Sequence, residues 1–263
     1  DQIYVDKTDM ICELASVPGK FFFARPRRFG KSLLLSTFES LFRDGLKNFQ
    51  GLKIEQLWTD KSTYKVIKLD FSRVKPEGTF EDFCQYFDNY LEAQFSLIGF
   101  KKEDNGLFLS NQIEIFLAGL SSSSLVLLID EYDAPLTACL DNKEFFERVR
   151  NYLSRFYGIL KANDRVLRFL FITGITKFNK TSIFSELNNL SDVSLSPRFG
   201  TLLGYTHEEV ETYFDGYLTQ SASVLSVSRD ELLRSLTKQY DGFCFERTTT
   251  KKVFAPWSLL KFF

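Results

Sequence analysis

The sequence predicts an α/β fold built on a parallel sheet that helices cover on both faces. Four short, β-rich runs lie at residues 20–24, 64–72, 124–133 and 167–174, and a segment of helical character separates each run from the next. Strands that alternate with helices along a chain are typical of parallel sheets. The uninterrupted apolar run LVLLI at 125–129 is typical of a strand buried on both sides.

Three segments between these runs have the apolar spacing of one-sided helices. Residues 80–98 and 145–161 place apolar side chains three and four positions apart, and residues 32–46 begin a helix directly after the first strand. A fifth strand is expected at residues 192–197. The core is therefore predicted to alternate strand and helix through residues 1–199.

The pattern changes beyond the last predicted strand, and residues 200–263 are predicted to form a mostly helical lid or subdomain beside the α/β core. Thr206 is followed three residues later by Glu209, which is the capping-box pattern that opens a helix. The same spacing recurs in SRDE at 228–231. Pro256 is predicted to start the last helix, because proline is favoured at the first helical position.

The composition and charge are ordinary for a soluble globular protein. Of the 263 residues, 44% are hydrophobic and 25% are charged, and 33 basic residues against 34 acidic ones give a net charge of −1. This balance does not favour a nucleic-acid or membrane-surface protein. No apolar run approaches the ~20 residues of a membrane span, so no membrane partner is expected.

The cysteines indicate the cellular compartment, and the two ends of the sequence indicate whether it is part of a longer protein. Cys12, Cys84, Cys139 and Cys244 lie far apart without the spacing of a zinc site, so we expect reduced thiols and a cytoplasmic protein. The sequence has no initial Met and stops inside an apolar segment. We therefore expect it to be an excerpt of a longer protein.

The strongest chemical motif is RPRRFGKS at residues 25–32. Its end, Gly30-Lys31-Ser32, matches the phosphate-loop pattern G-x-x-x-x-G-K-[ST], although Arg25 stands where that pattern has its first glycine. A predicted strand precedes the motif and a predicted helix follows it. In such a loop, backbone N–H groups and the lysine bind phosphates and the serine hydroxyl holds magnesium, so ATP and Mg²⁺ are the predicted ligands.

A second element supports this interpretation. The apolar strand at 124–133 ends in two adjacent carboxylates, Asp130 and Glu131. In a P-loop ATPase, the first acid orients Mg²⁺ and the second activates the attacking water. A solvated acid pair at a strand end is the alternative, but it does not account for the GKS motif upstream.

The order of the strands adds a further indication. One β-rich run, residues 64–72, lies between the loop strand and the acidic strand. Such an insertion fits the ASCE branch of P-loop NTPases, which places an additional strand between those two and carries a catalytic glutamate. The next strand carries Thr173 near its end, and this residue is expected either to contact the γ-phosphate or to serve as a cap or turn hydroxyl.

With these residues assembled, the chain resembles the AAA-ATPase-like domain family, which lies near the STAND and archaeal-type ATPases. Many members carry a PD-(D/E)XK-type nuclease domain after the ATPase. The matching stretches follow one another along almost the whole chain: YVDKTDMI (4–11), RPRRFGKSLLLSTFESLF (25–42), LIDEYDAPL (128–136), residues 173–197, LLGYTHEEV (202–210), YDGFCF (240–245) and FAPWSLLKFF (254–263).

The resemblance implies roles for the motif residues. Lys31 and Ser32 correspond to the phosphate and magnesium contacts, Asp130 to the magnesium acid, Glu131 to the base and Thr173 to the sensor position. Their cofactors would be ATP and Mg²⁺. The partner implied is a nuclease-like domain that follows in the full-length protein.

The remaining loop residues are interpreted through the same resemblance. The family carries RPRRFGKS itself, so Arg25 is a family trait. Phe29 belongs to the nucleotide-binding loop. Arg27 and Arg28 could neutralise phosphate charge or face solvent or a partner, and both alternatives stay open. Arg198 occupies a position expected to be acidic or variable, which argues against an arginine finger there.

The leading hypothesis is Mg²⁺-dependent ATP binding and hydrolysis that switches the conformation of an attached effector, with a nuclease as the expected effector. The alternative is a nucleotide-binding interaction module without turnover, because Pro26 removes an N–H donor from the loop. A phosphotransferase is less favoured, since the acid pair suits activation of water. Nucleic acid is expected only as an indirect partner, and an oligomer is compatible with the sequence.

Four residues carry lesser expectations. Asp133 is predicted to cap the following helix, Trp257 to tie the subdomain to the sheet and Lys7 to approach the adenine side. His207 is expected at the surface.

Overall fold

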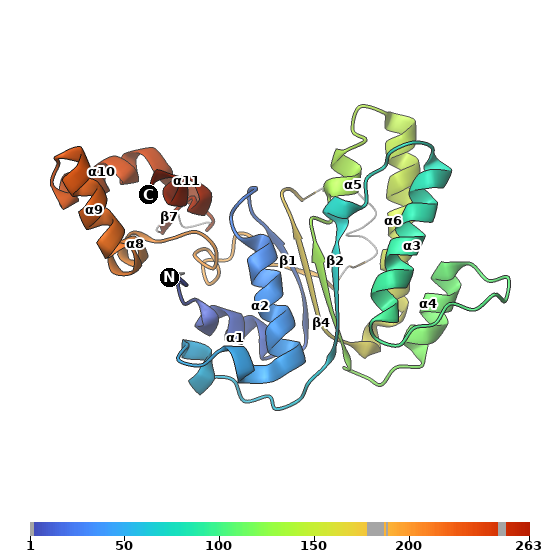
Figure 1. Cartoon of the computed structure of the whole chain (residues 1–263). Helices are drawn as coiled ribbons and strands as arrows, with labels where there is room; N and C mark the ends of the chain where they lie inside the picture. The colour runs from blue at the N-terminus through green and yellow to red at the C-terminus, as the bar shows by residue number, and fades with distance from the viewer. Residues whose placement is uncertain (1–2, 178–186, 188, 247–250) are drawn as a thin grey trace.

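A computed structural model describes residues 3–177, 187, 189–246 and 251–263 of the chain. It consists of an α/β core with a C-terminal subdomain beside it (Figure 1). Part of the segment 173–197, residues 178–186 and 188, lies outside the described residues. Two adjacent asparagines, Asn188 and Asn189, occur in the same segment, and Asn188 is one of the residues outside the described part.

The core is organised around a five-stranded sheet in which every pairing between neighbouring strands is parallel, and the strand order is β2-β3-β4-β1-β5. The predicted α/β fold with a parallel sheet flanked by helices is confirmed. The strands are β1 (Gly19–Ala24), β2 (Lys65–Asp70), β3 (Leu125–Asp130), β4 (Leu167–Gly174) and β5 (Ser191–Asp192).

One part of the strand assignment was wrong. The strand that separates β1 from β3 in the sheet is β4, and β2 lies at the edge beyond β3. Neighbours along the chain need not be neighbours in a sheet, because each crossover connection can pass over a strand. The interposed strand expected for the ASCE branch is therefore present, but it is the strand that carries Thr173.

The last strand is shorter than predicted. In the part of the chain that the structure describes, β5 consists of Ser191 and Asp192, and the N–H of Val193 adds one hydrogen bond to the Phe22 carbonyl of β1 at 3.0 Å. The Asp192 carboxylate accepts a hydrogen bond from the backbone N–H of Ser194 at 3.0 Å. The Ser194 hydroxyl in turn accepts the N–H of Ala24 in β1 at 2.9 Å, so side-chain bonds replace the backbone ladder beyond Val193.

Helices cover both faces of the sheet (Figure 1). Helices α1 (Thr8–Ala15) and α2 (Lys31–Asp44) lie on one face, and α3 (Phe80–Ser96), α4 (Leu109–Ala118) and α6 (Lys143–Ala162) lie on the other. Successive residues of a strand point to opposite faces of the sheet. Phe22 packs in the apolar cluster beneath α3, α4 and α6, and Phe23 packs in the apolar cluster beneath α1 and α2. The short elements are η1 (Gly45–Asn48), η2 (Lys53–Gln56), η3 (Phe71–Arg73), α5 (Ala134–Thr137) and η4 (Asp164–Val166).

The C-terminal subdomain has an apolar cluster of its own, which includes Val210, Phe214 and Leu218. Its elements are α8 (His207–Tyr213), α9 (Asp215–Leu225), α10 (Arg229–Tyr240), β6 (Asp241–Cys244), β7 (Lys252–Phe254) and α11 (Pro256–Phe262). The antiparallel β6–β7 pair was not predicted, because strands of four and three residues carry too little pattern.

Several local features agree with the sequence. The Thr206 hydroxyl accepts the Glu209 N–H at 3.2 Å, and the Glu209 carboxylate accepts the Thr206 N–H at 2.8 Å, so the capping box is formed. The Ser228 hydroxyl accepts the Glu231 N–H at 3.1 Å before α10. His207 is exposed in the first turn of α8 and lies 3.3 Å from Glu211.

We expect Thr206→Ala to lower the stability of the chain by about 1 kcal/mol, because the first turn of α8 loses its side-chain acceptor. Urea denaturation would measure the change. Thr219→Ala is the matched control, since Thr219 is exposed within α9. Equal stability of the two variants would contradict a structural role for the capping box.

Candidate functional site

The predicted site residues meet at one end of the sheet. Parallel strands place their carboxyl ends at the same edge, and β1, β3 and β4 are neighbours there. Phe23 of β1 pairs with Thr173 of β4, and Ile129 of β3 pairs with Ile172. The phosphate loop that follows β1 therefore lies beside Asp130, which ends β3.

The loop turns sharply into α2. Gly30 is the N-cap residue of that helix and has φ 94°, a left-handed conformation that glycine adopts without steric cost. Arg28 also has a positive φ, 65°, which is strained for a residue with a Cβ. The N–H groups at the start of α2 point out of the helix, which is the arrangement that binds anions.

Arg25, which replaces the first glycine of the phosphate-loop pattern, is a buried structural residue. Only 1% of its surface is exposed. Its guanidinium donates to the carbonyl oxygens of Ser194 at 2.7 Å and Phe199 at 3.0 Å, and it lies between two rings, 4.0 Å from the centroid of Phe23 and 4.1 Å from that of Phe245. Burial lowers its pKa to about 9, and Asp192 opposes this shift, so Arg25 stays charged at neutral pH.

Lys31 occupies the inside of the loop. Its ammonium donates to the carbonyl oxygens of Arg25 and Pro26, both at 3.0 Å, and the residue is 5% exposed. Burial lowers the pKa of Lys31, and the carboxylates of Asp130 and Glu131 oppose the shift. The cation is thus already directed into the space that the loop encloses.

Ser32, Asp130 and Thr173 form a hydrogen-bonded set. The Ser32 hydroxyl donates to Asp130 Oδ2 at 2.5 Å, and the Thr173 hydroxyl donates to Asp130 Oδ1 at 2.5 Å. Thr173 is fully buried, whereas Ser32 is exposed. The hydroxyl of Thr173 therefore orients the carboxylate of Asp130, and it is not a helix cap.

Glu131 follows directly and adopts φ 48°. A positive φ at a glutamate is uncommon, and such strain is frequent at functional sites. Its side chain is half-buried. Desolvation by burial raises the pKa of Glu131, the neighbouring Asp130 raises it further, and Lys31 opposes both. A raised pKa makes this carboxylate a stronger base than an exposed glutamate.

Asp133 occupies the N-cap position of α5, as expected, but its side chain does not cap that helix. Its carboxylate oxygen Oδ2 accepts the N–H groups of Ile175 at 2.9 Å and Thr176 at 3.1 Å, and it makes no side-chain cap bond to α5. The Tyr132 hydroxyl donates to the carbonyl of Thr176 at 2.8 Å. Together these bonds fasten the acidic loop after β3 to the segment that leaves β4.

The outer part of the phosphate loop contacts the C-terminal subdomain. The guanidinium carbon of Arg28 lies 4.1 Å from the Trp257 ring centroid. The Phe29 ring packs edge-on against Phe243 at 4.9 Å and Phe245 at 5.3 Å. Arg27 is exposed. Trp257 was predicted to tie the subdomain to the sheet, but it is 52% exposed and contacts the phosphate loop instead.

A cavity of about 130 Å³ opens beside Gly30. Leu33 of α2, Leu203 and Tyr4 give it an apolar lining, and Lys7 also reaches it. The Lys7 ammonium donates to the carbonyl of Thr201 at 2.5 Å and lies 2.9 Å from the Glu209 carboxylate. Lys7 therefore links the N-terminal segment to the subdomain at the border of this cavity.

Arg198 lies away from these groups and forms an ion pair with Glu13. No cluster of three or more His, Cys, Asp or Glu side chains suited to a metal occurs in the described parts of the chain. Within the same residues, no helix has both the length and the apolar character that crossing a membrane requires.

Comparison with known families agrees with this arrangement. Residues 1–184 match the AAA-ATPase-like family, described as predicted AAA-ATPase. The chain belongs to this family. The matched region contains the phosphate loop, the acid pair and Thr173, and so the residues that meet at the end of the sheet all lie within it.

Two individual proteins are also similar. An uncharacterized protein in the vnfD 5′ region of Azotobacter chroococcum mcd 1 is 30% identical over 265 residues. The match covers 100% of this chain and 48% of that protein, so the chain spans about half the length of this curated relative. The crystal structure of Cdc6p from Pyrobaculum aerophilum aligns with a TM-score of 0.39 at 15% identity, over 84% of this chain and 52% of that one.

The sequence did not predict three features of the site. They are the hydrogen bonds from Ile175 and Thr176 to Asp133, the aromatic contacts of Phe29 and the cavity beside Gly30. A sequence signal was present for the role of Asp133, because the sequence DEYD places this further acid just past the end of the strand, after Asp130 and Glu131. No sequence signal connects Phe29 with Phe243 and Phe245, which are more than two hundred residues away.

Restoring the standard motif with Arg25→Gly is expected to destabilise the chain by about 3 kcal/mol, because buried carbonyls lose their donor. Urea denaturation tests this, with Arg27→Gly as the matched control in the same loop. Wild-type stability in Arg25→Gly would refute the structural role assigned to Arg25.

Proposed function

We propose that this chain binds Mg·ATP at the phosphate loop and hydrolyses it. The observation that carries the proposal is the meeting of Lys31, Ser32 and Asp130 at the N-terminus of α2, where the hydroxyl and the carboxylate face each other at 2.5 Å. This arrangement supplies a cation for phosphates and an oxygen pair for a metal at the same place.

Binding uses groups that are already in position. Lys31 exchanges the carbonyls of Arg25 and Pro26 for phosphate oxygens, which are charged acceptors and form stronger hydrogen bonds. The free N–H groups at the start of α2 supply further donors. Pro26 lacks one donor, but its carbonyl lies within the loop and accepts a hydrogen bond from Lys31 at 3.0 Å.

The residues also fit Mg²⁺. This ion takes oxygen ligands and is commonly held by one or two carboxylates together with phosphates, so a larger acidic cluster is not needed. Ser32 and Asp130 supply the protein oxygens. Bound there, the ion would neutralise phosphate charge. Thr173 keeps the Asp130 carboxylate in one orientation through its 2.5 Å hydrogen bond.

Hydrolysis depends on Glu131. Its carboxylate accepts a proton from the water that attacks the γ-phosphorus, while the bond from that phosphorus to the bridging oxygen breaks and ADP leaves. The raised pKa favours proton uptake. The positive φ of Glu131 and the bonds of Tyr132 and Asp133 to the segment after β4 support this role, because they fix the base relative to the strand ends.

The cavity beside Gly30 is the proposed place for the base of the nucleotide. Its apolar lining by Leu33, Leu203 and Tyr4 suits a flat heterocycle, and its position next to the phosphate loop fits a molecule that extends from the phosphates. The sequence did not identify these residues as a group.

We further propose that nucleotide state is communicated to the C-terminal subdomain. Arg28 and Phe29 of the phosphate loop contact Trp257, Phe243 and Phe245 of the subdomain, so movement of the loop acts directly on α11 and β6. The relative from Azotobacter chroococcum is about twice as long as this chain. An effector domain, with a nuclease as the candidate, is the proposed recipient of this movement.

Lys31→Ala is expected to weaken ATP affinity roughly 10- to 100-fold, since a charged hydrogen bond to phosphate is lost. Calorimetry with Mg·ATP measures this. Lys47→Ala, which removes an exposed lysine after α2, serves as the control and should bind as wild type does. If Lys31→Ala binds Mg·ATP with the affinity of wild type, the assignment of the phosphate site is wrong.

Glu131→Gln is expected to keep ATP affinity and to lose roughly 100-fold or more of turnover, because the base is removed. Release of inorganic phosphate measures turnover. If wild type binds ATP but releases no phosphate at high protein concentration, the chain is a nucleotide-binding module without turnover. If Glu131→Gln hydrolyses as wild type does, Glu131 is not the base.

Binding of Mg·ATP is expected to change tryptophan fluorescence, because phosphates compete with the Trp257 ring for the Arg28 guanidinium. The change should disappear in Trp257→Phe while calorimetric binding persists, leaving Trp58 as a buried, constant emitter. Arg28→Ala should also abolish it. A change that survives in Trp257→Phe would contradict communication through this contact.

A further inference from the structure

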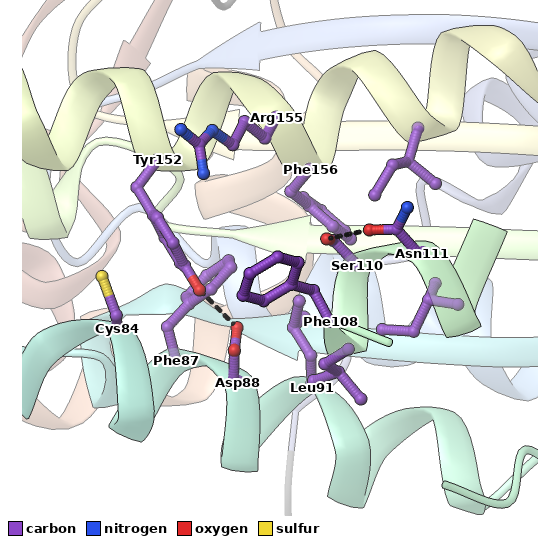
Figure 2. Close-up of a pocket in the computed structure, with 13 residues that line it drawn as sticks. Cys84, Phe87, Asp88, Leu91, Phe108, Ser110, Asn111, Tyr152, Arg155 and Phe156 are labelled. Carbon is purple, nitrogen blue, oxygen red and sulfur yellow. Dashed lines mark hydrogen bonds between the residues drawn. The ribbon is translucent and has the colours of Figure 1, made fainter. Parts of the chain in front are cut away.

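A second cavity lies away from the phosphate loop, between α3, α4 and α6. It has a volume of about 490 Å³, within the range of small-molecule sites. Phe87, Leu91, Ile113 and Phe156 are buried in its walls. Phe108 also lines the cavity, although 82% of its surface is exposed (Figure 2). An apolar body of the size of a bicyclic ring system fits such a space.

Polar groups gather on one side of this cavity. Asp88 and Cys84 come from α3 and Tyr152 from α6, and Figure 2 shows the Tyr152 side chain extending toward Asp88. The Tyr152 hydroxyl donates to Asp88 Oδ1 at 2.8 Å. Within the described residues, no hydrogen bond or ion pair occupies Asp88 Oδ2. A few fixed polar groups beside an apolar lining are what orient a ligand.

The charges around the cavity favour a cationic ligand. Asp88 is half-buried, and desolvation raises its pKa, while the hydrogen bond from Tyr152 and the charge of Lys102 oppose that shift without cancelling it. Lys102 acts on Asp88 only from a distance, since its ammonium is bound to Glu92 at 3.1 Å. Arg155 is exposed, with its guanidinium carbon 6.0 Å from the Tyr152 ring centroid, so its charge is screened by solvent.

The thiol and the phenol beside Asp88 remain neutral. Burial raises the pKa of Cys84 to about 11, and burial together with Asp88 raises that of Tyr152. The lining residues of α4 at this point, Ser110 and Asn111, carry no charge. Asp88 is therefore the group that a positively charged ligand would meet inside the cavity.

We propose that the cavity between α3, α4 and α6 is a binding site for a small aromatic amine, whose ammonium group pairs with Asp88 and whose ring system lies among Phe87, Leu91 and Phe156. None of the lining residues belongs to the phosphate site, and the cavity lies on the face of the sheet opposite α1 and α2. The proposal of an aromatic amine therefore does not depend on the proposal that the phosphate loop binds ATP.

Two probes with the same ring and opposite charge test the proposal. Tryptamine carries an ammonium group on an indole, and indole-3-acetate carries a carboxylate. Calorimetry on the whole chain is expected to give tryptamine a dissociation constant of about 1 mM or lower, which is reasonable for a ligand of this size. Indole-3-acetate should bind at least about tenfold more weakly, because it places like charge beside Asp88.

Two variants test separately the contribution of the Asp88 charge and that of the apolar space to the binding of tryptamine. Asp88→Asn should weaken tryptamine at least about tenfold, since a charge-assisted bond is lost while the acceptor for Tyr152 remains. Glu114→Gln is the matched control, because it removes one exposed carboxylate from α4 outside the cavity lining. Ile159→Trp, which fills the space from α6, should abolish binding of tryptamine.

The outcomes are distinct from those of the ATP experiments. Tighter binding of indole-3-acetate than of tryptamine would overturn the assigned charge and point to Arg155. Equal tryptamine affinity in wild type and Asp88→Asn, or failure of wild type to bind it, would overturn the proposal. Denaturation curves establish that each variant is folded. Asp88→Asn should keep the ATP affinity of wild type.

Discussion

The buried guanidinium of Arg25 is the interaction on which the rest of the phosphate site depends. It satisfies carbonyl oxygens of Ser194 and Phe199, and it lies between the rings of Phe23 and Phe245. One side chain thereby holds together the end of β1, the segment that follows β5 and the C-terminal subdomain. Removing a buried, hydrogen-bonded charge leaves its partners unsatisfied, so the Arg25 side chain belongs to the structure of the loop and not to its surface.

Asp130 organises the chemical part of the site in a comparable way. Its two carboxylate oxygens accept hydroxyl groups from Ser32 and Thr173, which come from α2 and β4. A carboxylate with both oxygens engaged has one orientation, so the oxygen that faces Ser32 is fixed before any ligand arrives. The adjacent Glu131 differs in environment, with a strained backbone and a raised pKa. Two neighbouring acids therefore have different properties because their surroundings differ.

The sheet separates two regions with different chemistry. The phosphate loop at the end of β1 is rich in cations and backbone donors, and it borders the subdomain through Arg28 and Phe29. The cavity among α3, α4 and α6 is apolar with a carboxylate at its side. Helix α6 follows closely after the loop that contains Glu131 and Asp133. The residues of α6 that line the cavity, from Tyr152 to Ile159, lie farther along that helix, so the two regions are separate along the chain as well.

The sequence by itself determined the alternation of strands and helices, the phosphate loop, the acid pair and the capped helix at Thr206, because each depends on residues close together in the chain. Tertiary structure alone decided that β4 separates β1 from β3, that Arg25 is buried, and that Asp133 binds the segment after β4. It also brought Trp257 to Arg28 and formed both cavities. Each of these features depends on contacts between residues that are far apart in the sequence. The pattern of apolar and polar residues along one sequence indicates local secondary structure, but it does not indicate which distant segments pack against each other.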